Sequence, residues 1–410
     1  MIRPTVARVD LNALKTNYRY LAAHIAAGTG VGADPADSRP HDSRPLTTII
    51  AVVKANAYGH GAPQVARALE GAGATTLACA DIEEGAALRA AGVRAEILVF
   101  GALSVSDLDG LFDCRLTPTI STPGAARAVQ AAAAKYHQRI RYHLKIDTGM
   151  NRLGFRFDNL RRTLPDLLAS PNLDLDAVYT HCATADNPES PHFNEQRVRF
   201  DRAVAELQTF NRKERGERSE EIGTSIHSPV SAFSAVKRPY VHAANSAALL
   251  RDSRVWYDRV RPGLLLYGLV PPPLASTIPL TPVMTLHSRV VAVKGVRAGE
   301  GVGYGLKFNA ESPASIAIIP AGYADGLDLR LSGRGVVLIR GRRVPIVGAV
   351  SMDMLTADVT GLDVSPGDEV VLIGSQGQER IDAREMAATI GTIPYEVLCR
   401  IGSRIERVYD

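Results

Sequence analysis

The hydrophobic pattern opens with a short apolar run and continues with a helical repeat. Residues 3–9 predict a strand, and Asp10 is a suitable N-cap for a helix over residues 11–27. The apolar residues that recur at helical spacing and mark its buried face are Leu11, Leu14, Tyr18, Leu21 and Ile25. Residues 28–45 are rich in Gly, Asp, Ser and Pro, so we expect a surface insertion there.

From Thr47 onward, short β-branched runs alternate with helical patterns. The runs that predict strands cover residues 47–53, 76–80, 97–100, 115–120, 140–146, 175–181, 240–244 and 258–264. This alternation predicts an α/β fold, a (β/α)8 TIM-like barrel. A doubly wound open sheet would give similar local patterns. No G-x-G-x-x-G or P-loop string stands at a strand–helix junction, which disfavours a dinucleotide or nucleoside triphosphate site.

The rhythm changes after Pro271-Pro272-Pro273. Residues 283–296 alternate without intervening helices. Further β runs follow over residues 315–319, 335–339, 344–349 and 369–373. A short helix is predicted near residues 382–389. We therefore predict a (β/α)8 barrel domain over residues 1–270 and a mainly β C-terminal domain over residues 271–410. The first strand, within residues 1–10, is a candidate to join the second domain.

Composition narrows the class of protein. The chain has 410 residues, of which 46% are hydrophobic, which is enough for two domains. Lys and Arg number 47 against 43 Asp and Glu, and this small net charge of +4 does not favour nucleic acid or an anionic membrane as a partner. The four cysteines form no C-x-x-C pair, so we expect no metal site. Without a signal-peptide core or a membrane-length apolar run, we expect a cytoplasmic protein.

Lys54 ends one of the predicted barrel strands. Gly59 and Gly61 interrupt the chain after it, and a helical pattern starts at Ala62-Pro63. Ligands bind at this end of the strands in α/β sheets and barrels. A partly desolvated amine there can lose its proton and form an imine with a carbonyl cofactor. Position alone, however, favours a lysine that caps the strand or pairs with a carboxylate.

Two strings resemble signatures of one enzyme family. V-V-K-A-N-A-Y-G-H-G, at residues 52–61, resembles the pyridoxal 5'-phosphate (PLP) lysine motif of the alanine racemases, PLP-dependent enzymes of fold type III. H-L-K-I-D-T-G-M-N-R-L-G, at residues 143–154, resembles their second signature. The resemblance implies that Arg152 contacts the cofactor phenolate and the substrate carboxylate, which a guanidinium can bind bidentately. Lys145 matches a lysine that is carbamylated in some members of the family.

Strings at other strand ends match cofactor-binding residues of the same family. The resemblance implies that His181 lies in the cofactor shell and that Arg261 faces the pyridine nitrogen. It places the cofactor phosphate on Tyr58, Ser246, Gly263, Leu264 and Tyr395. Without the family, His181 is more typical of a packed side chain, and the phosphate segments read as ordinary turns. A guanidinium keeps its proton, so Arg261 would not protonate the ring nitrogen, and transamination would be suppressed.

Racemisation needs a proton removed from one face of the α-carbon and delivered to the other, most simply by two groups. The resemblance implies that Lys54 is one and that Tyr304, in G-E-G-V-G-Y-G-L, is the other. Taken alone, the Tyr304 string favours an exposed loop residue. The family also brings Tyr323, Met352 and Asp353 to the substrate, although Met352 could equally belong to the core. In the family these residues and Tyr304 come from the partner subunit.

The resemblance runs from Lys54 to Tyr395 in family order and departs from it in the insertions at 28–45 and 211–230. It implies a PLP-dependent alanine racemase that interconverts L-alanine and D-alanine and supplies D-alanine for peptidoglycan. It also implies an obligate homodimer with shared active sites. A broad-specificity amino-acid racemase on the same fold is the alternative. A PLP-carrier protein is disfavoured because such proteins resemble the barrel alone.

Overall fold

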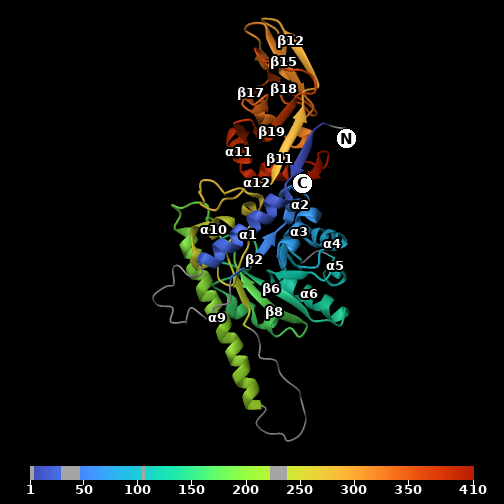
Figure 1. Cartoon of the computed structure of the whole chain (residues 1–410). Helices are drawn as coiled ribbons and strands as arrows, with labels where there is room; N and C mark the ends of the chain where they lie inside the picture. Colours follow the sequence, from blue (N-terminus) through green and yellow to red (C-terminus); the bar gives the residue numbers. More distant parts are fainter. Residues whose placement is uncertain (1–3, 29–46, 104–106, 222–237) are drawn as a thin grey trace. The chain divides into compact units, whose positions relative to one another are not determined.

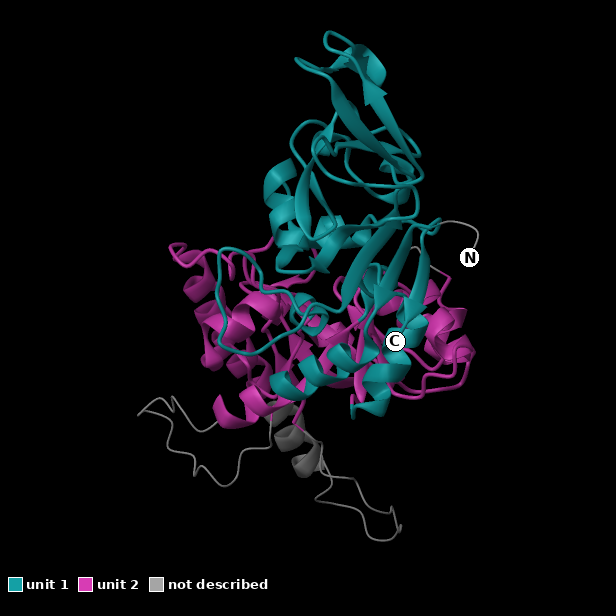
Figure 2. Cartoon of the chain, turned by 45° about the horizontal axis from the view of Figure 1, so that its top comes forward, with its two compact units in different colours: residues 1–21, 53–73, 263–410 teal, residues 22–52, 74–262 magenta. Residues whose placement is uncertain are grey.

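The computed structural model describes residues 4–28, 47–103, 107–221 and 238–410 (Figure 1). The chain divides into two compact units, which Figure 2 distinguishes by colour. The first comprises residues 1–21, 53–73 and 263–410, and the second residues 22–52 and 74–262. The insertion predicted over residues 28–45 lies outside the described residues except for Gly28 and so stays a prediction.

Eight parallel strands of the second unit close into a barrel. They are β2 Thr48–Val52, β3 Thr76–Cys79, β4 Glu96–Val99, β5 Thr117–Ile120, β6 Ile140–Asp147, β8 Leu173–Tyr179, β9 Tyr240–His242 and β10 Arg259–Val260. Each pairs with its neighbour, and the ring closes because β5 pairs with β6 and β10 pairs with β2. The closed ring confirms the predicted TIM-like barrel and excludes an open doubly wound sheet.

The barrel strands are apolar because both of their faces are covered. All four residues of β3 and all four of β5 are buried. Helices α4 Ile82–Ala90 and α6 Pro123–Lys135 pack outside these strands (Figure 1). Each begins at a side-chain cap: Asp81 accepts from the Glu84 amide, and Thr122 accepts from the Ala125 amide. Such a cap stabilises a helix by about 1 kcal/mol.

The remaining elements of residues 11–267 are short, except for the two long helices over residues 11–28 and 192–221. They are α1 Leu11–Gly28, α2 Lys54–Tyr58, α3 Ala62–Gly71, α5 Asp109–Asp113, β7 Phe155–Arg156, α7 Leu160–Thr163, α8 Pro165–Leu168, α9 His192–Glu221, α10 Ser246–Arg251, and the 3-10 helices η2 Ser253–Val255 and η3 Leu264–Tyr267. The strand predicted over residues 258–264 is wrong at its end, because β10 stops at Val260 and Leu264 begins η3. Pro262 cannot donate a ladder hydrogen bond, so the strand ends before it.

A ten-stranded sheet dominates the first unit and confirms the mainly β architecture after Pro271. Its strands are β1 Val6–Val9, β11 Met284–Arg289, β12 Ala292–Val296, β15 Ala314–Ile319, β16 Val336–Ile339, β17 Arg342–Val347, β18 Leu355–Asp358, β19 Glu369–Gln376, β20 Glu379–Ile381 and β21 Glu406–Tyr409. Strand β1 lies between β11, which runs antiparallel to it, and β21, which runs parallel. The first strand of the chain is thus held by its last.

Smaller elements complete the first unit. They are the pair β13 Gly301–Val302 and β14 Phe308–Asn309, the 3-10 helices η4 Tyr304–Leu306, η5 Tyr323–Asp325 and η6 Leu329–Leu331, and the helices α11 Ala383–Ile390 and α12 Pro394–Cys399. The compact units do not follow chain order, so the domain boundary between residues 270 and 271 stays a prediction. None of the described helices combines the length and the apolarity needed to cross a membrane.

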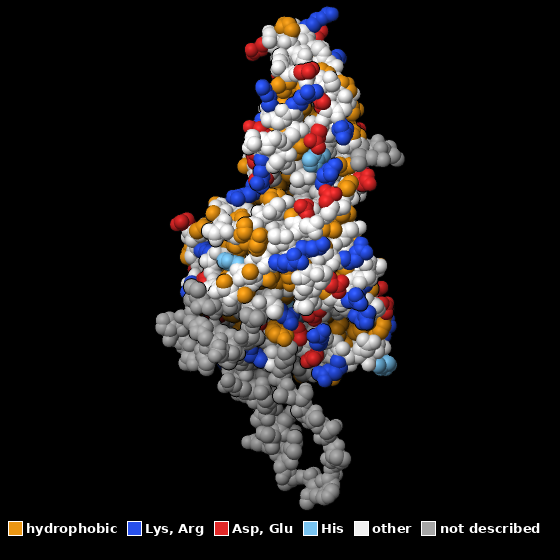
Figure 3. Space-filling view, in the orientation of Figure 1, with side chains coloured by type: hydrophobic (Ala, Val, Ile, Leu, Met, Phe, Trp, Pro, Cys, Tyr) orange, Lys and Arg blue, Asp and Glu red, His pale blue; other side chains and the backbone are white. Residues whose placement is uncertain are grey.

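The described surface carries charges of both signs. On the face shown in Figure 3, Lys and Arg side chains lie interspersed with Asp and Glu. Some form surface ion pairs, such as Lys135 with Asp109 at 2.7 Å and Arg156 with Asp158 at 2.7 Å. This mixture of signs agrees with the small net charge of the chain.

Candidate active site

Lys54 follows β2 and begins a turn with a left-handed backbone. Residues 55–58 are four consecutive non-glycine residues with φ between 51° and 54°. This conformation costs an L-residue roughly 1–2 kcal/mol, so surrounding bonds must hold it. The Gly59 amide closes the turn by donating to the carbonyl of Ala55 at 3.0 Å. The turn leaves the Lys54 side chain exposed at the end of the strand, as a residue that meets a cofactor must be.

Four of the five residues predicted to bind phosphate lie together in the first unit. Tyr58 is buried, and its ring packs against that of Tyr395 with the centroids 6.0 Å apart. Its hydroxyl lies so close to Gly263 that a β-carbon there would come within 2.2 Å of the oxygen, so a larger residue would fill this space. Leu264 follows directly. Burial raises the pKa of Tyr58, so the hydroxyl keeps its proton and can donate it in a hydrogen bond to an anion.

His60 supports this turn from the core. Its side chain is fully buried, and Nδ1 lies 3.0 Å from the Ala57 carbonyl and 2.9 Å from the Tyr58 carbonyl, to which it donates. The ring packs against Tyr267 with the centroids 4.4 Å apart. Burial lowers the pKa of His60 to about 4, so the ring is neutral in the folded chain near pH 7.

We predict that His60 makes the folded state less stable in acid. Because the pKa is about 4 folded and about 6.5 unfolded, the unfolded chain takes up the proton first as pH falls. The contribution of His60 to the free energy of unfolding is therefore full above pH 6.5. It declines towards pH 4, with a loss of about 3 kcal/mol. Urea unfolding between pH 4.5 and 7.5 measures the slope. His60→Asn keeps a donor but cannot titrate, so its slope should be shallower, and equal slopes would contradict the prediction.

Arg261 lies in the core of the barrel unit directly after β10, with only 3% of its surface exposed. One terminal nitrogen donates to Nδ1 of His242 at 2.6 Å. The other donates to the carbonyls of Thr180 and Ala243 at 2.8 and 2.9 Å and lies 3.3 Å from Nδ1 of His181. Burial lowers the pKa of Arg261 to about 10, so the guanidinium still carries its charge at neutral pH. The predicted pair of His181 and Arg261 is therefore in contact.

The loop after β6 carries Arg152, and Asp147 orders that loop. The Asp147 carboxylate accepts from three successive amides, those of residues 149–151, at 2.9 to 3.1 Å. Arg152 itself is exposed, whereas Lys145 is buried with its ammonium 5.8 Å from the Tyr179 ring centroid. Sequence reasoning did not single out Asp147, although an aspartate at a strand end before glycine is a typical loop-ordering residue.

Ser246 is the first residue of α10 and is 4% exposed. The helix is capped by Asn245, whose side chain accepts from the Ala248 amide at 2.9 Å. Ser246 therefore stands at the turn after β9, on the same unit as Arg261, where the sequence places it.

The residues predicted on the substrate side lie on loops of the first unit, with Tyr304 and Tyr323 at the start of the short 3-10 helices η4 and η5 within them. The exposed fractions are 76% for Tyr304, 47% for Tyr323 and 52% for Met352. The Tyr323 amide donates to the Ser351 carbonyl at 3.0 Å, which joins two of these loops. Asp353 accepts from Arg404 at 2.6 Å. Met352 is thus a surface residue, and the alternative that it packs in the core is wrong.

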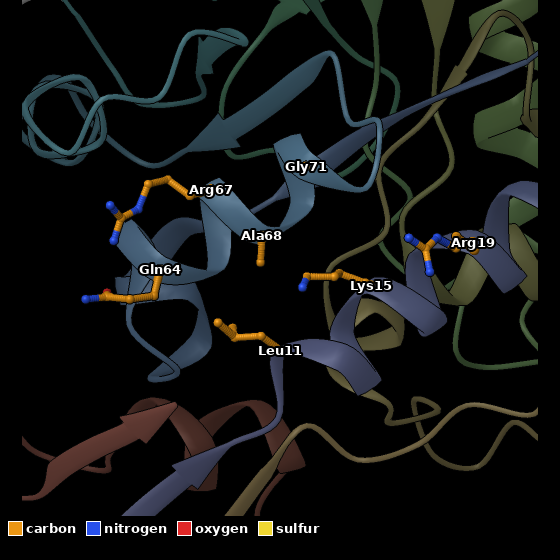
Figure 4. Close-up of a pocket in the computed structure, with 7 residues that line it drawn as sticks. All are labelled: Leu11, Lys15, Arg19, Gln64, Arg67, Ala68 and Gly71. Atoms are coloured by element: carbon orange, nitrogen blue, oxygen red, sulfur yellow. The ribbon is translucent and has the colours of Figure 1, made fainter. Parts of the chain in front are cut away.

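A separate pocket of about 420 Å³ lies between α1 and α3 of the first unit (Figure 4). Its lining residues are Leu11, Lys15, Arg19, Gln64, Arg67, Ala68 and Gly71. Figure 4 shows Leu11, Lys15 and Ala68 pointing into the gap, whereas Gln64 and Arg67 point away from it. No predicted site residue lines this pocket, so it is not the candidate active site.

Comparison with protein families gives a match along nearly the whole chain. The N-terminal domain of alanine racemase matches residues 40–219 and 224–271, and the C-terminal domain of alanine racemase matches residues 283–409. The chain belongs to the alanine racemase family. Racemases are isomerases, so this is the enzyme class of the chain. The alanine racemase of Carboxydothermus hydrogenoformans is 39% identical over 414 residues, which cover 100% of each chain, and that of Nostoc sp. is 39% identical over 369 residues, 89% of each.

Solved alanine racemase structures share the fold. The enzyme of Streptomyces lavendulae has a TM-score of 0.84 at 32% identity, with 100% of this chain and 98% of the other covered. The Bacillus anthracis alanine racemase with bound L-Ala-P has a TM-score of 0.82 at 32% identity, covering 100% and 96%. The Bartonella henselae alanine racemase with covalently bound pyridoxal phosphate has a TM-score of 0.79 at 28% identity, covering 99% of both chains.

Proposed function

We propose that this alanine racemase family member uses PLP to interconvert L-alanine and D-alanine, and that it supplies D-alanine for peptidoglycan. The observation that carries the proposal is the family match along nearly the whole chain, together with 39% identity to a curated alanine racemase over its full length. The order of the matched segments, from the barrel through the β domain, supports the same conclusion. A neighbour with covalently bound pyridoxal phosphate supports the cofactor.

The residues present fit PLP chemically. Hydroxyls and a glycine backbone suit a phosphate, and a β-carbon at Gly263 would fill the space beside the Tyr58 hydroxyl. A charged, buried guanidinium at Arg261 can donate to a ring nitrogen but cannot protonate it. We assign the phosphate to Tyr58, Ser246, Gly263, Leu264 and Tyr395, and the ring to Arg261 and His181. When bound, PLP takes up the electron pair that stays on the α-carbon once its proton leaves.

The protein moves the protons. We propose that Nζ of Lys54 would hold the cofactor and that the same amine exchanges a proton at one face of the α-carbon. The hydroxyl of Tyr304 exchanges a proton at the other face. Arg152 binds the substrate carboxylate through its guanidinium, which orients the α-carbon between the two bases. Tyr323, Met352 and Asp353 contribute to the substrate side of the site.

We further propose an obligate homodimer in which these loops complete the partner's site. The support is their exposure: six of the ten large hydrophobic side chains that are exposed among the described residues lie in segments 304–306, 323–329 and 352–354. They comprise Tyr304, Leu306, Tyr323, Leu329, Met352 and Met354. A monomer gains nothing from exposed apolar side chains of this size grouped on neighbouring loops, whereas an interface buries them.

The four cysteines, Cys79, Cys114, Cys182 and Cys399, are free thiols. Free thiols suit a reducing compartment, and we propose that the enzyme acts in the cytoplasm.

Reduction of the holoenzyme with borohydride tests the cofactor assignment. The reagent should fix the cofactor to Lys54, peptide mapping should find the adduct there, and the untreated enzyme should racemise alanine. Lys54→Ala is the control, because this variant should form no adduct at position 54. An adduct at Lys145, the other lysine in a family signature, would contradict the assignment, and turnover confined to larger amino acids would contradict the substrate.

A further inference from the structure

The barrel core contains a chain of polar side chains that starts at Arg261. Its guanidinium contacts Nδ1 of His242 on β9 at 2.6 Å, and Nε2 of His242 lies 3.0 Å from Nδ1 of His143 on β6. Nε2 of His143 in turn lies 3.5 Å from Oδ2 of Asp176 on β8. Both histidines have no exposed surface. These contacts link Arg261, at the carboxyl end of β10, to the carboxylate of Asp176, midway along β8.

Chemistry fixes the direction of every contact in this chain. Arginine only donates, so Nδ1 of His242 accepts, and the proton of this ring must sit on Nε2. That N–H can only be directed at Nδ1 of His143, which therefore accepts and leaves the His143 proton on Nε2. Burial and the charge of Arg261 lower the pKa of His242 well below its usual value, so the ring is neutral as this pattern requires.

Asp176 is placed to receive the last proton. The register between β6 and β8 shifts at this point: Tyr142 pairs with Leu175 and His143 with Ala177, so Asp176 is the extra residue of a bulge. Bulges re-aim a side chain. Here Nε2 of His143 and Oδ2 of Asp176 are both buried and face each other at 3.5 Å, and neither forms a hydrogen bond to any other group in the described part of the chain.

We propose that His143 and Asp176 are positioning residues for Arg261. Asp176 keeps the proton on Nε2 of His143, this keeps Nδ1 of His143 an acceptor, and His242 is thereby held with its own acceptor towards the guanidinium. The inference rests on the proposed function, in which Arg261 faces the cofactor ring nitrogen. We call this series of contacts from Asp176 through His143 to His242 the relay. Without it, His242 can turn an N–H towards Arg261, and two donors then face each other.

The same region could suggest a metal site, because Glu96, His143 and Asp176 each bring a ligand atom within 4.8 Å of the others. The relay argues against it. A metal needs a lone pair on Nε2 of His143, but that nitrogen carries the proton. Arg141 and Arg259 also lie near Glu96, at 3.4 and 3.8 Å, and supply the positive charge that its carboxylate needs.

Nitrogen NMR of the holoenzyme with ring-labelled histidine tests the proton positions directly. We expect His143 and His242 both as neutral Nε2–H rings, with a coupling across the bond between them, and His143→Asn identifies the pair by removing it. A His143 ring protonated on Nδ1 would overturn the proposal. A shift of these signals on adding zinc alone would overturn it in favour of the metal site.

The second readout is the ratio of racemisation to transamination. If Arg261 moves off the ring nitrogen, water can protonate that nitrogen, and transamination becomes faster relative to racemisation. His143→Leu should therefore raise the share of transamination at least about tenfold. His143→Asn restores an acceptor near the Nδ1 position and should return the ratio towards the wild-type value. Leu144→Ala, on the opposite face of the same strand, is the control for lost stability.

An unchanged ratio in His143→Leu, or an equal rise in Leu144→Ala, would overturn the positioning role. Asp176→Leu should act like His143→Leu, and Asp176→Asn, which keeps an acceptor, should act less. The nitrogen signals report on the relay even in a chain that does not racemise alanine. Failure of the relay and failure of the proposed function are therefore distinguishable.

Discussion

Tyr304→Phe is expected to lower racemisation by about 10²–10⁴-fold while leaving α-proton exchange in one enantiomer largely intact. L-alanine and D-alanine have equal free energies, so the two directions of racemisation must slow equally. Exchange differs, because Lys54 alone can remove and return a proton on its own face. Solvent deuterium should therefore still enter the enantiomer that Lys54 serves, while it no longer enters the other.

Deuterium incorporation, followed separately in L-alanine and D-alanine, measures this asymmetry. Loss of one hydroxyl should not unfold the chain, because Tyr304 is 76% exposed. Tyr20→Phe is a matched control, since Tyr20 is also an exposed tyrosine but lies on α1 and outside the candidate site. Equal loss of exchange in both enantiomers would contradict the two-base mechanism.

Mixing two inactive variants, Lys54→Ala and Tyr304→Phe, is expected to restore about a quarter of the wild-type activity. In a symmetric dimer with shared sites, random exchange makes half of the dimers mixed, and one of the two sites in each mixed dimer has both wild-type residues. Activity should appear from two nearly inactive preparations. Sites built from one chain would give no such recovery.

The measurement is activity after subunit exchange, with exchange itself shown by a mass tag on one variant. Mixing Lys54→Ala with Lys54→Arg is the control, since no dimer of these carries a wild-type Lys54. Absence of recovery despite proven exchange would contradict the shared sites.

The sequence alone predicts the barrel and the mainly β region well because each has its own hydrophobic period. The barrel strands are short and buried, and their alternation with helices predicts an α/β fold. The choice between a barrel and an open sheet depends on two pairings, β5 with β6 and β10 with β2, which the local pattern does not show. Chain order could not reveal how the strands of the first unit pair, since β1 joins β11 and β21 only through contacts far apart in sequence.

The candidate site could be predicted only in part from the sequence. The proposed roles of Lys54, Arg152 and Arg261 follow from family motifs. The left-handed backbone of residues 55–58 could not be predicted, because Ala and Tyr rarely adopt positive φ and four such residues in succession need tertiary bonds to hold them. The link from His143 to Asp176 was equally hidden, because it depends on a shift in strand register.

The position of β1 has a consequence for biosynthesis. Val6–Val9 is synthesised about 400 residues before its parallel neighbour Glu406–Tyr409. At about 5–20 residues per second, this strand waits roughly 20 to 80 seconds for its partner. During that time the nascent chain exposes an apolar strand edge, so truncation or slow translation before residue 406 should draw chaperones to residues 6–9.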